Sequence, residues 1–194
     1  MNKFHWCAAA GLSLVLPLAA MSAPVTYDFD PSHTYPSFAA DHLGGVSVWR
    51  GKFNSSRGLV VLDREALKGS IDVTVDIKSI DFGNDELNAH VQTEDFFDEA
   101  KYPTANFKGQ FTEFNGDVPT QAEGLLTLHG VSHPLVLNIK RFKCMEHPME
   151  MREVCGADIT ATFNRADYGL DFLVDQGFKP EVELQIQVEA LRRN

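Results

Sequence analysis

Alternation of apolar and polar residues constrains this chain more than any other feature. Every second residue from Ile71 to Lys78 is apolar, and the segment from Val182 to Glu189 repeats the pattern. A period of two places successive side chains on opposite faces of a β-strand, so each segment has one face for a core and one for water. The chain is therefore predicted to be all-β.

Weaker alternation predicts further strands, and Gly, Pro, Asn or Asp punctuates most of the gaps between them. Strands that follow one another closely, with no helical periodicity between most of them, favour a barrel or sandwich over a parallel α/β sheet. A closed eight-stranded antiparallel barrel would bury every apolar face and remove exposed edges, so this is the architecture we expect. The further strands cover residues 25–30, 37–41, 46–53, 58–63, 105–114, 124–129, 135–142 and 157–164.

One segment, residues 84–93, departs from the strand pattern. Leu87 and Val91 are four residues apart, and Asp85 and Glu86 stand where a helix would have its first turn. Acidic residues favour the amino end of a helix, and Asn84 is a suitable capping residue. A single short helix is therefore predicted here.

The first 22 residues have the layout of a signal peptide. Lys3 precedes an apolar and small stretch from Cys7 to Ala20, which is shorter than a membrane-spanning helix requires. Small residues at Ala20 and Ser22 suit cleavage before Ala23. We therefore expect an exported, periplasmic protein whose residues 23–194 form one domain, with no transmembrane segment.

Net charge limits the kinds of binding partner, and the cysteines indicate a disulfide. The formal net charge of −10 disfavours nucleic acid and anionic membrane surfaces as electrostatic partners. Once the leader is removed, Cys144 and Cys155 remain as a pair, and an oxidising compartment favours a disulfide between them. The segment between them contains Met and His, soft ligands that suit Cu(I), so a copper-binding hairpin is an alternative function.

Signals of catalysis and of a metal centre are weak. The chain has no Gly-x-Ser-x-Gly motif, and Ser132 and His133 are chain neighbours whose side chains would point to opposite faces of a strand. Asp72 and Asp76 alternate with apolar residues and so belong to a solvated face. His129 and His133 have the spacing of metal ligands, but Gly130 and Pro134 beside them favour a turn. We expect no enzyme activity, no metal site and no required cofactor.

Several short motifs, in order along the chain, resemble the YceI-like polyisoprenoid-binding family. The chain departs from the family pattern in two places. In the helix the family commonly has Arg-Asp where this chain has Leu87 and Asn88, with Val91 for Leu, and in the later block it has Thr where this chain has Ser132. The first change removes a charge pair, and the second keeps a hydroxyl group. The motifs are Tyr-Asp-Phe-Asp-Pro-Ser-His at 27–33, Gly-Lys-Phe at 51–53, Asp-Phe-Phe-Asp at 95–98, Lys-Tyr-Pro at 101–103, Gly-Leu-Leu-Thr-Leu-His-Gly-Val-Ser-His-Pro at 124–134 and Asn-Arg-Ala-Asp-Tyr-Gly at 164–169.

The resemblance implies a lipocalin-like barrel that holds a long isoprenoid lipid, such as a quinone or polyprenyl lipid, without reaction chemistry. A ligand-free envelope stress or interaction protein with a filled barrel is the alternative, and the oligomeric state stays open, a homodimer included. His33, His42, His90 and Arg165 are expected at a barrel end, where Arg165 would pair with a carboxylate or meet the lipid's polar head. The predicted lipid-binding wall comprises Phe38, Phe53, Val73, Val75, Phe107, Phe111, Leu126, Leu137, Phe163 and Ile186.

Overall fold

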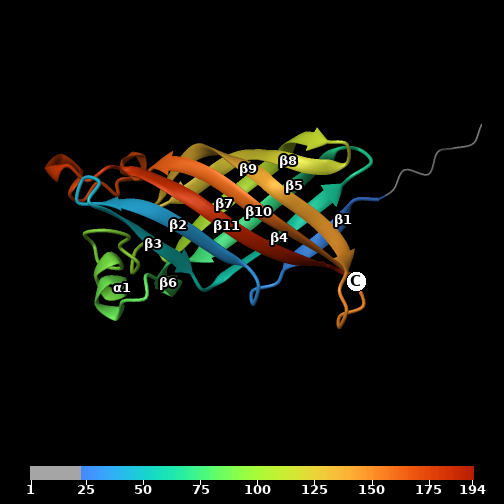
Figure 1. The fold of residues 1–194 in the computed structure, drawn as a ribbon, viewed down its shortest axis with the longest axis horizontal. Coiled ribbons are helices and arrows are strands. Elements are labelled where there is room, and N and C mark those ends of the chain that lie inside the picture. Colours follow the sequence, from blue (N-terminus) through green and yellow to red (C-terminus); the bar gives the residue numbers. More distant parts are fainter. Residues whose placement is uncertain (1–22) are drawn as a thin grey trace, which may run out of the picture.

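The computed structural model describes residues 23–194 as one eleven-stranded antiparallel sheet that curls into a tube (Figure 1). The predicted leader, residues 1–22, lies outside the described residues. The strands are β1 Val25–Phe29, β2 Tyr35–His42, β3 Ser47–Phe53, β4 Ser56–Asp63, β5 Lys68–Asp76, β6 Ile80–Asp81, β7 Thr104–Asn115, β8 Val118–Leu128, β9 Val131–Glu146, β10 Glu153–Asn164 and β11 Glu181–Arg192.

The strand registers show that the eleven strands occupy eight positions around the barrel. At three of these positions, two short strands follow each other end to end. β11 pairs with β10 on one side, and on its other side with β2 along residues 182–187 and with β1 along 190–192. β3 and β4 then pair with β2 and β1 in turn, and β6 and β5 pair with β3 and β4. The pairs β1/β2, β3/β4 and β5/β6 therefore fill three positions and β7 to β11 fill five. The predicted closed eight-stranded barrel is confirmed.

The predicted short helix is also confirmed. Helix α1 spans Asp85–Val91, and the Oδ1 of Asn84 accepts a hydrogen bond from the Leu87 amide at 3.0 Å. Short 3-10 helices, η1 Ile77–Ser79, η2 Arg165–Tyr168 and η3 Val174–Gln176, complete the connections. Among residues 23–194, no helix is both long enough and apolar enough to cross a membrane.

Each predicted strand segment overlaps an observed strand, but some boundaries differ. β8 begins at Val118 and β9 extends to Glu146, so both are longer than predicted. Pro134, which the sequence indicated as part of a turn, lies within β9, and Pro119 lies within β8, where it is fully buried. β6 has only two residues, too few for a period of two to be visible.

The expected disulfide joins Cys144 on β9 to Cys155 on β10. The two residues are direct cross-strand partners, with Cα atoms 4.0 Å apart. Cys155 is buried in an apolar cluster with Tyr27, Leu62 and Ala190, which packs one end of the barrel. The disulfide therefore ties the β9–β10 hairpin at the packed end.

Replacing both Cys144 and Cys155 with Ala is expected to lower the free energy of unfolding by about 2–3 kcal/mol, because the unfolded chain gains the entropy of an open loop. Urea unfolding measured without reductant checks this value. Wild-type protein unfolded with reductant provides the control, since it should match the variant. Equal stability of the oxidised wild type and the variant would contradict the expectation.

Candidate functional site

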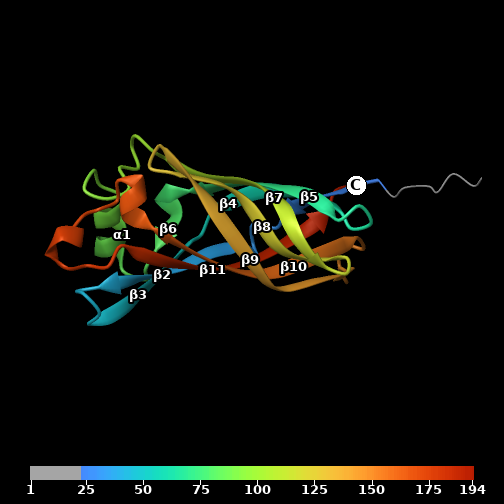
Figure 2. The same ribbon diagram turned by 90° about the horizontal axis from the view of Figure 1, so that it is seen from above.

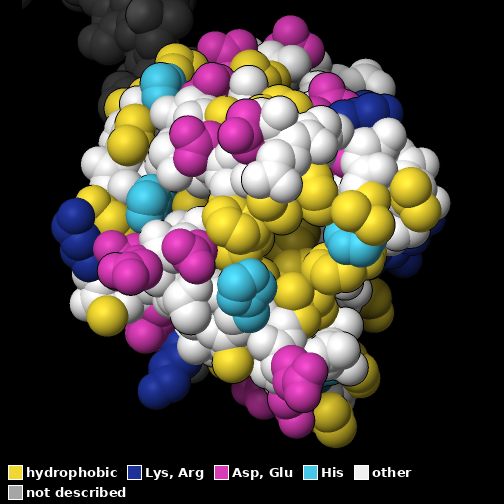
Figure 3. All heavy atoms as spheres, turned by 90° about the vertical axis from the view of Figure 1, so that its left-hand side faces the viewer, with side chains coloured by type: hydrophobic (Ala, Val, Ile, Leu, Met, Phe, Trp, Pro, Cys, Tyr) yellow, Lys and Arg dark blue, Asp and Glu magenta, His cyan; other side chains and the backbone are white. Residues whose placement is uncertain are grey.

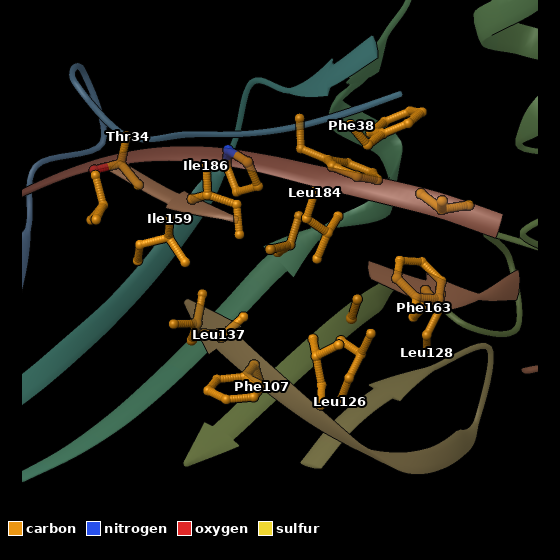
Figure 4. Close-up of a pocket in the computed structure, with 18 of the residues that line it drawn as sticks. Thr34, Phe38, Phe107, Leu126, Leu128, Leu137, Ile159, Phe163, Leu184 and Ile186 are labelled. Atoms are coloured by element: carbon orange, nitrogen blue, oxygen red, sulfur yellow. The ribbon is translucent and has the colours of Figure 1, made fainter. Parts of the chain in front are cut away.

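The barrel encloses an elongated apolar cavity of about 310 Å³. Figure 4 shows side chains from strands around the barrel converging on this space. β11 contributes Val182, Leu184, Ile186, Val188 and Ala190, which are alternate residues on its inner face. At about 3.3 Å per residue these five residues span roughly 26 Å of strand. The cavity is therefore long and narrow rather than spherical.

Every predicted wall residue lines this cavity. The strand period accounts for this agreement, because a correct register turns all apolar positions of a strand inward together. Their role in binding a lipid stays a prediction. The residues are Phe38, Phe53, Val73, Val75, Phe107, Phe111, Leu126, Leu137, Phe163 and Ile186.

Polar groups on the inner wall are few, and several are bonded within the protein. Thr34 is 1% exposed, and its hydroxyl group donates to the carbonyl of Glu189 and accepts from the Glu189 amide. The side-chain amide of Asn106 donates to the hydroxyl of Thr74 at 2.7 Å. These groups have little hydrogen-bonding capacity left for a ligand. The inner wall therefore favours an apolar molecule.

One end of the cavity is an open mouth surrounded by aromatic side chains. Figure 3 views this end and shows a hollow lined by apolar side chains, with histidines at its edge. The His42 ring stacks on Trp49 at 3.9 Å between centroids, and the Phe96 and Phe172 rings lie 4.6 Å apart. Leu87, at one of the positions that depart from the family pattern, also lines the cavity here. We call this end the cavity mouth.

Sequence reasoning missed the aromatic residues at the cavity mouth. They lie in the segments before and after α1 and in the connection between β10 and β11. These segments have no regular alternation that would indicate which side chains face inward. The sequence indicated them only through its 14 phenylalanines and, for Phe96 and Phe97, through the Asp-Phe-Phe-Asp motif. The missed residues are Phe82, Phe96, Phe97, Phe172 and Phe178.

The opposite end of the cavity is closed by packed side chains. The cluster of Tyr27, Leu62, Cys155 and Ala190 fills this end, and Phe111, Phe114 and Phe142 pack against it. The hydroxyl of Tyr27 donates to Glu153 at 2.7 Å, and burial together with this carboxylate raises the pKa of Tyr27. A neutral tyrosine therefore stays in place at the closed end over the physiological pH range.

Arg165 lies at the cavity mouth without the carboxylate partner that we had expected. No ion pair to it occurs within 4.0 Å among residues 23–194. Its guanidinium instead donates to the backbone carbonyls of Leu170 and Phe172, the latter at 3.0 Å. Burial lowers the pKa of Arg165, while Asp171 and Asp41 act in the opposite direction. Arg165 holds the loop after η2 and is one of the few cationic groups on the cavity wall.

The histidines divide differently from our expectation. His42 and His90 belong to the cavity mouth, where they contact Trp49 and Phe96. His33 was wrongly placed with them: its Nδ1 lies 2.7 Å from Asp30 in the β1–β2 connection, beside Glu189 near the far end of β11. Two other histidines bond to loop backbone. The ring nitrogens of His129 and His133 contact the carbonyls of Tyr168 and Asp167 at 3.1 and 3.0 Å.

The β9–β10 hairpin offers little of the donor set that copper would need. Cys144 and Cys155 are consumed by their disulfide. The Nδ1 of His147 accepts hydrogen bonds from the amides of Met149 and Glu150. Met149 is 83% exposed, so its thioether lies in solvent. The geometry indicates a stapled turn.

Comparison with known proteins identifies the family of this barrel. The model of the YceI-like domain matches residues 27–190, which include every strand except β1's first two residues and β11's last two. The chain belongs to the YceI-like family. A UPF0312 protein of Shewanella baltica is 31% identical over 195 residues, with all of both chains covered.

Solved structures show that this YceI-like chain has the same fold as distant relatives. A YceI protein of Campylobacter jejuni has a TM-score of 0.62 at 23% identity, covering 77% of this chain and 88% of its own. A polyisoprenoid-binding domain from Saccharophagus degradans has a TM-score of 0.58 at 15% identity, covering 86% and 98%. At these identities the likeness establishes the fold alone.

Replacing Arg165 with Leu is expected to lower the free energy of unfolding by about 2 kcal/mol, because two partly buried carbonyls lose a charged hydrogen-bond donor. Urea unfolding checks the loss of stability. If Arg165 serves only to hold the loop, affinity for an apolar ligand in the cavity stays unchanged in the folded variant. Unchanged stability would contradict the structural role.

Proposed function

We propose that this protein is an exported, periplasmic binder of a long-chain polyisoprenoid, such as a quinone or polyprenyl lipid. The tail lies inside the barrel, and the polar head lies at the cavity mouth. The observation that carries the proposal is the cavity itself, which is long, apolar and closed at one end. The Saccharophagus degradans relative, described as a polyisoprenoid-binding domain, supports the same class of ligand.

Burial of the tail supplies the binding energy. Each methylene removed from water contributes about 0.8 kcal/mol, so burying about ten of them yields roughly 8 kcal/mol before the cost of ordering the chain. Polar contacts are not needed for this affinity. An unsatisfied hydrogen-bonding group deep in the cavity would oppose it, and the bonded state of Thr34 and Asn106 avoids that cost.

The cavity mouth offers the polar groups that a head group would meet. Three residues with ionisable side chains line the cavity at its mouth: Asp41, His42 and Arg165. Arg165 can donate to a carbonyl or hydroxyl oxygen, and the aromatic rings beside it can stack on a planar head. These groups hold a ligand and supply no nucleophile with an adjacent base, so the proposed role is binding without catalysis.

The competing interpretation, a filled barrel acting only through its outer surface, fits the structure less well. Phenylalanines packed across the barrel would have filled the interior. Instead Phe38, Phe53 and Phe163 lie along the wall and stay partly accessible within the cavity. Cavity volume costs stability, and an apolar ligand inside the barrel would offset that cost.

Replacing Ile186 with Trp is expected to abolish co-purification of a prenyl lipid, because the indole ring would block the middle of the cavity. Native mass spectrometry after mild purification from the natural host measures the bound lipid. Gln187→Trp is the matched control, since this neighbouring residue on the same strand is exposed. The proposal fails if wild-type protein carries no prenyl lipid and added quinone does not bind.

Export predicts a defined amino terminus. Protein recovered from the periplasm is expected to begin at Ala23, as measured by intact mass. Ala20→Lys is expected to block this processing, because signal peptidase requires a small residue at that position. An unprocessed chain retained in the cytoplasm would contradict the proposed location.

A further inference from the structure

The hairpin between β2 and β3 carries an exposed apolar tip beside the cavity mouth. Leu43 is 54% exposed, Val46 76% and Val48 51%. No residue from Leu43 to Trp49 is charged, and we call this segment the mouth tip. Figure 2 shows the hairpin projecting at the same end of the barrel as α1 and away from that helix. An exposed apolar patch of this kind marks an interaction surface.

We propose that the mouth tip docks onto the surface of a phospholipid bilayer, so that the cavity opens toward the membrane. This inference rests on the proposed function, because a lipid cargo makes contact with a bilayer necessary. A prenyl chain that crossed water would expose every methylene at a cost of about 0.8 kcal/mol each. Loading directly from the bilayer avoids that exposure.

Trp49 connects the mouth tip with the cavity. Its ring stacks on His42, lines the cavity and is still 37% exposed. Tryptophan is enriched at membrane–water interfaces, where its apolar body and polar N–H group are both accommodated. Val48 precedes Trp49 on β3 and so faces the opposite side of the strand, which leaves apolar side chains on both faces of the hairpin beside the cavity mouth.

Two cations flank the mouth tip, one beside its turn and one after Trp49, and their charge complements lipid phosphates. Lys179 places its ammonium group beside Gly45, and Arg50 follows Trp49 directly. In the part of the chain that the structure describes, neither cation forms an ion pair. The nearby carboxylate of Asp41 accepts a hydrogen bond from the backbone amide of Lys179. With the tip inserted, both cations would lie at the level of the head groups.

A bilayer fits the mouth tip better than a second copy of the chain does. Another barrel covering the tip would also cover the cavity mouth and so obstruct the cargo. The remaining acidic surface disfavours a purely electrostatic attraction to anionic lipids, since the net charge is −10. Insertion of uncharged side chains is therefore the main contribution, with the two cations as a supplement.

Flotation of lipid-free mature protein with phosphatidylcholine vesicles tests the inference. The variant Leu43→Asn/Val46→Ser is expected to bind at least about tenfold more weakly, because two apolar side chains no longer enter the interface. Asparagine suits position 43, where φ is 54°, so the turn is retained. In protein lacking the leader, Trp49 is the only tryptophan, and brominated acyl chains should quench its fluorescence.

The matched control is Leu67→Asn/Val136→Ser, which removes apolar surface elsewhere. Leu67 has a similar exposure of 47% and a similar φ of 51°, but it lies in the β4–β5 turn at the closed end. This control should bind vesicles like wild-type protein. The inference is overturned if wild-type protein does not bind, if both double variants bind equally, or if the tip variant abolishes only a concentration-dependent dimer.

Failure of this inference can be distinguished from failure of the proposed function. Cargo affinity measured in detergent does not require docking, so the tip variant should retain it while transferring lipid between vesicles at least about tenfold more slowly. If wild-type protein binds vesicles but does not bind a prenyl lipid in detergent, the carrier role alone is rejected. Equal transfer rates for wild type and tip variant would reject the docking role alone.

Discussion

The pairing of the first strand with the last is the contact on which the rest of this barrel depends. Tyr27, Asp28 and Phe29 of β1 lie opposite Arg192, Leu191 and Ala190 of β11. Asp28 is also held by the guanidinium of Arg193, which lowers the pKa of this carboxyl group. Without this pairing the sheet would stay open between β1 and β11, and its apolar inner face would be exposed to water there. Closure turns a curled sheet into a container with an inside.

A container need not be filled to be stable, because its wall is held by backbone hydrogen bonds between neighbouring strands. Buried apolar clusters pack the closed end, the side formed by β5 and β7 to β10, and the region where Tyr168 and Leu170 meet Ile77. The remaining wall residues are apolar but incompletely covered. An apolar ligand would therefore bury wall side chains that folding leaves partly exposed. The free energy of that burial would contribute to binding.

Strand identity and inward-facing residues could be predicted from the sequence because both follow from a period of two. The family resemblance implied Phe107 and Leu137 as wall residues, and the structure places both on the inner wall, as the strand period requires once the register is set. Loop residues have no such period. The misplacement of His33, the backbone partners of Arg165 and the rings around the cavity mouth all depend on how connections fold over the barrel end. Hollowness likewise depends on side-chain packing between distant strands, which no local pattern reports.

The packed cluster at the closed end has a consequence for the size of the cargo. A tail that enters from the cavity mouth must stop at Tyr27 and Leu62, so the distance from these residues to the mouth sets the greatest length that can be enclosed. Each further methylene stays in water at a cost of about 0.8 kcal/mol. For the proposed lipid, the depth of the barrel would thus set the preferred tail length, and larger residues at the closed end would favour shorter tails.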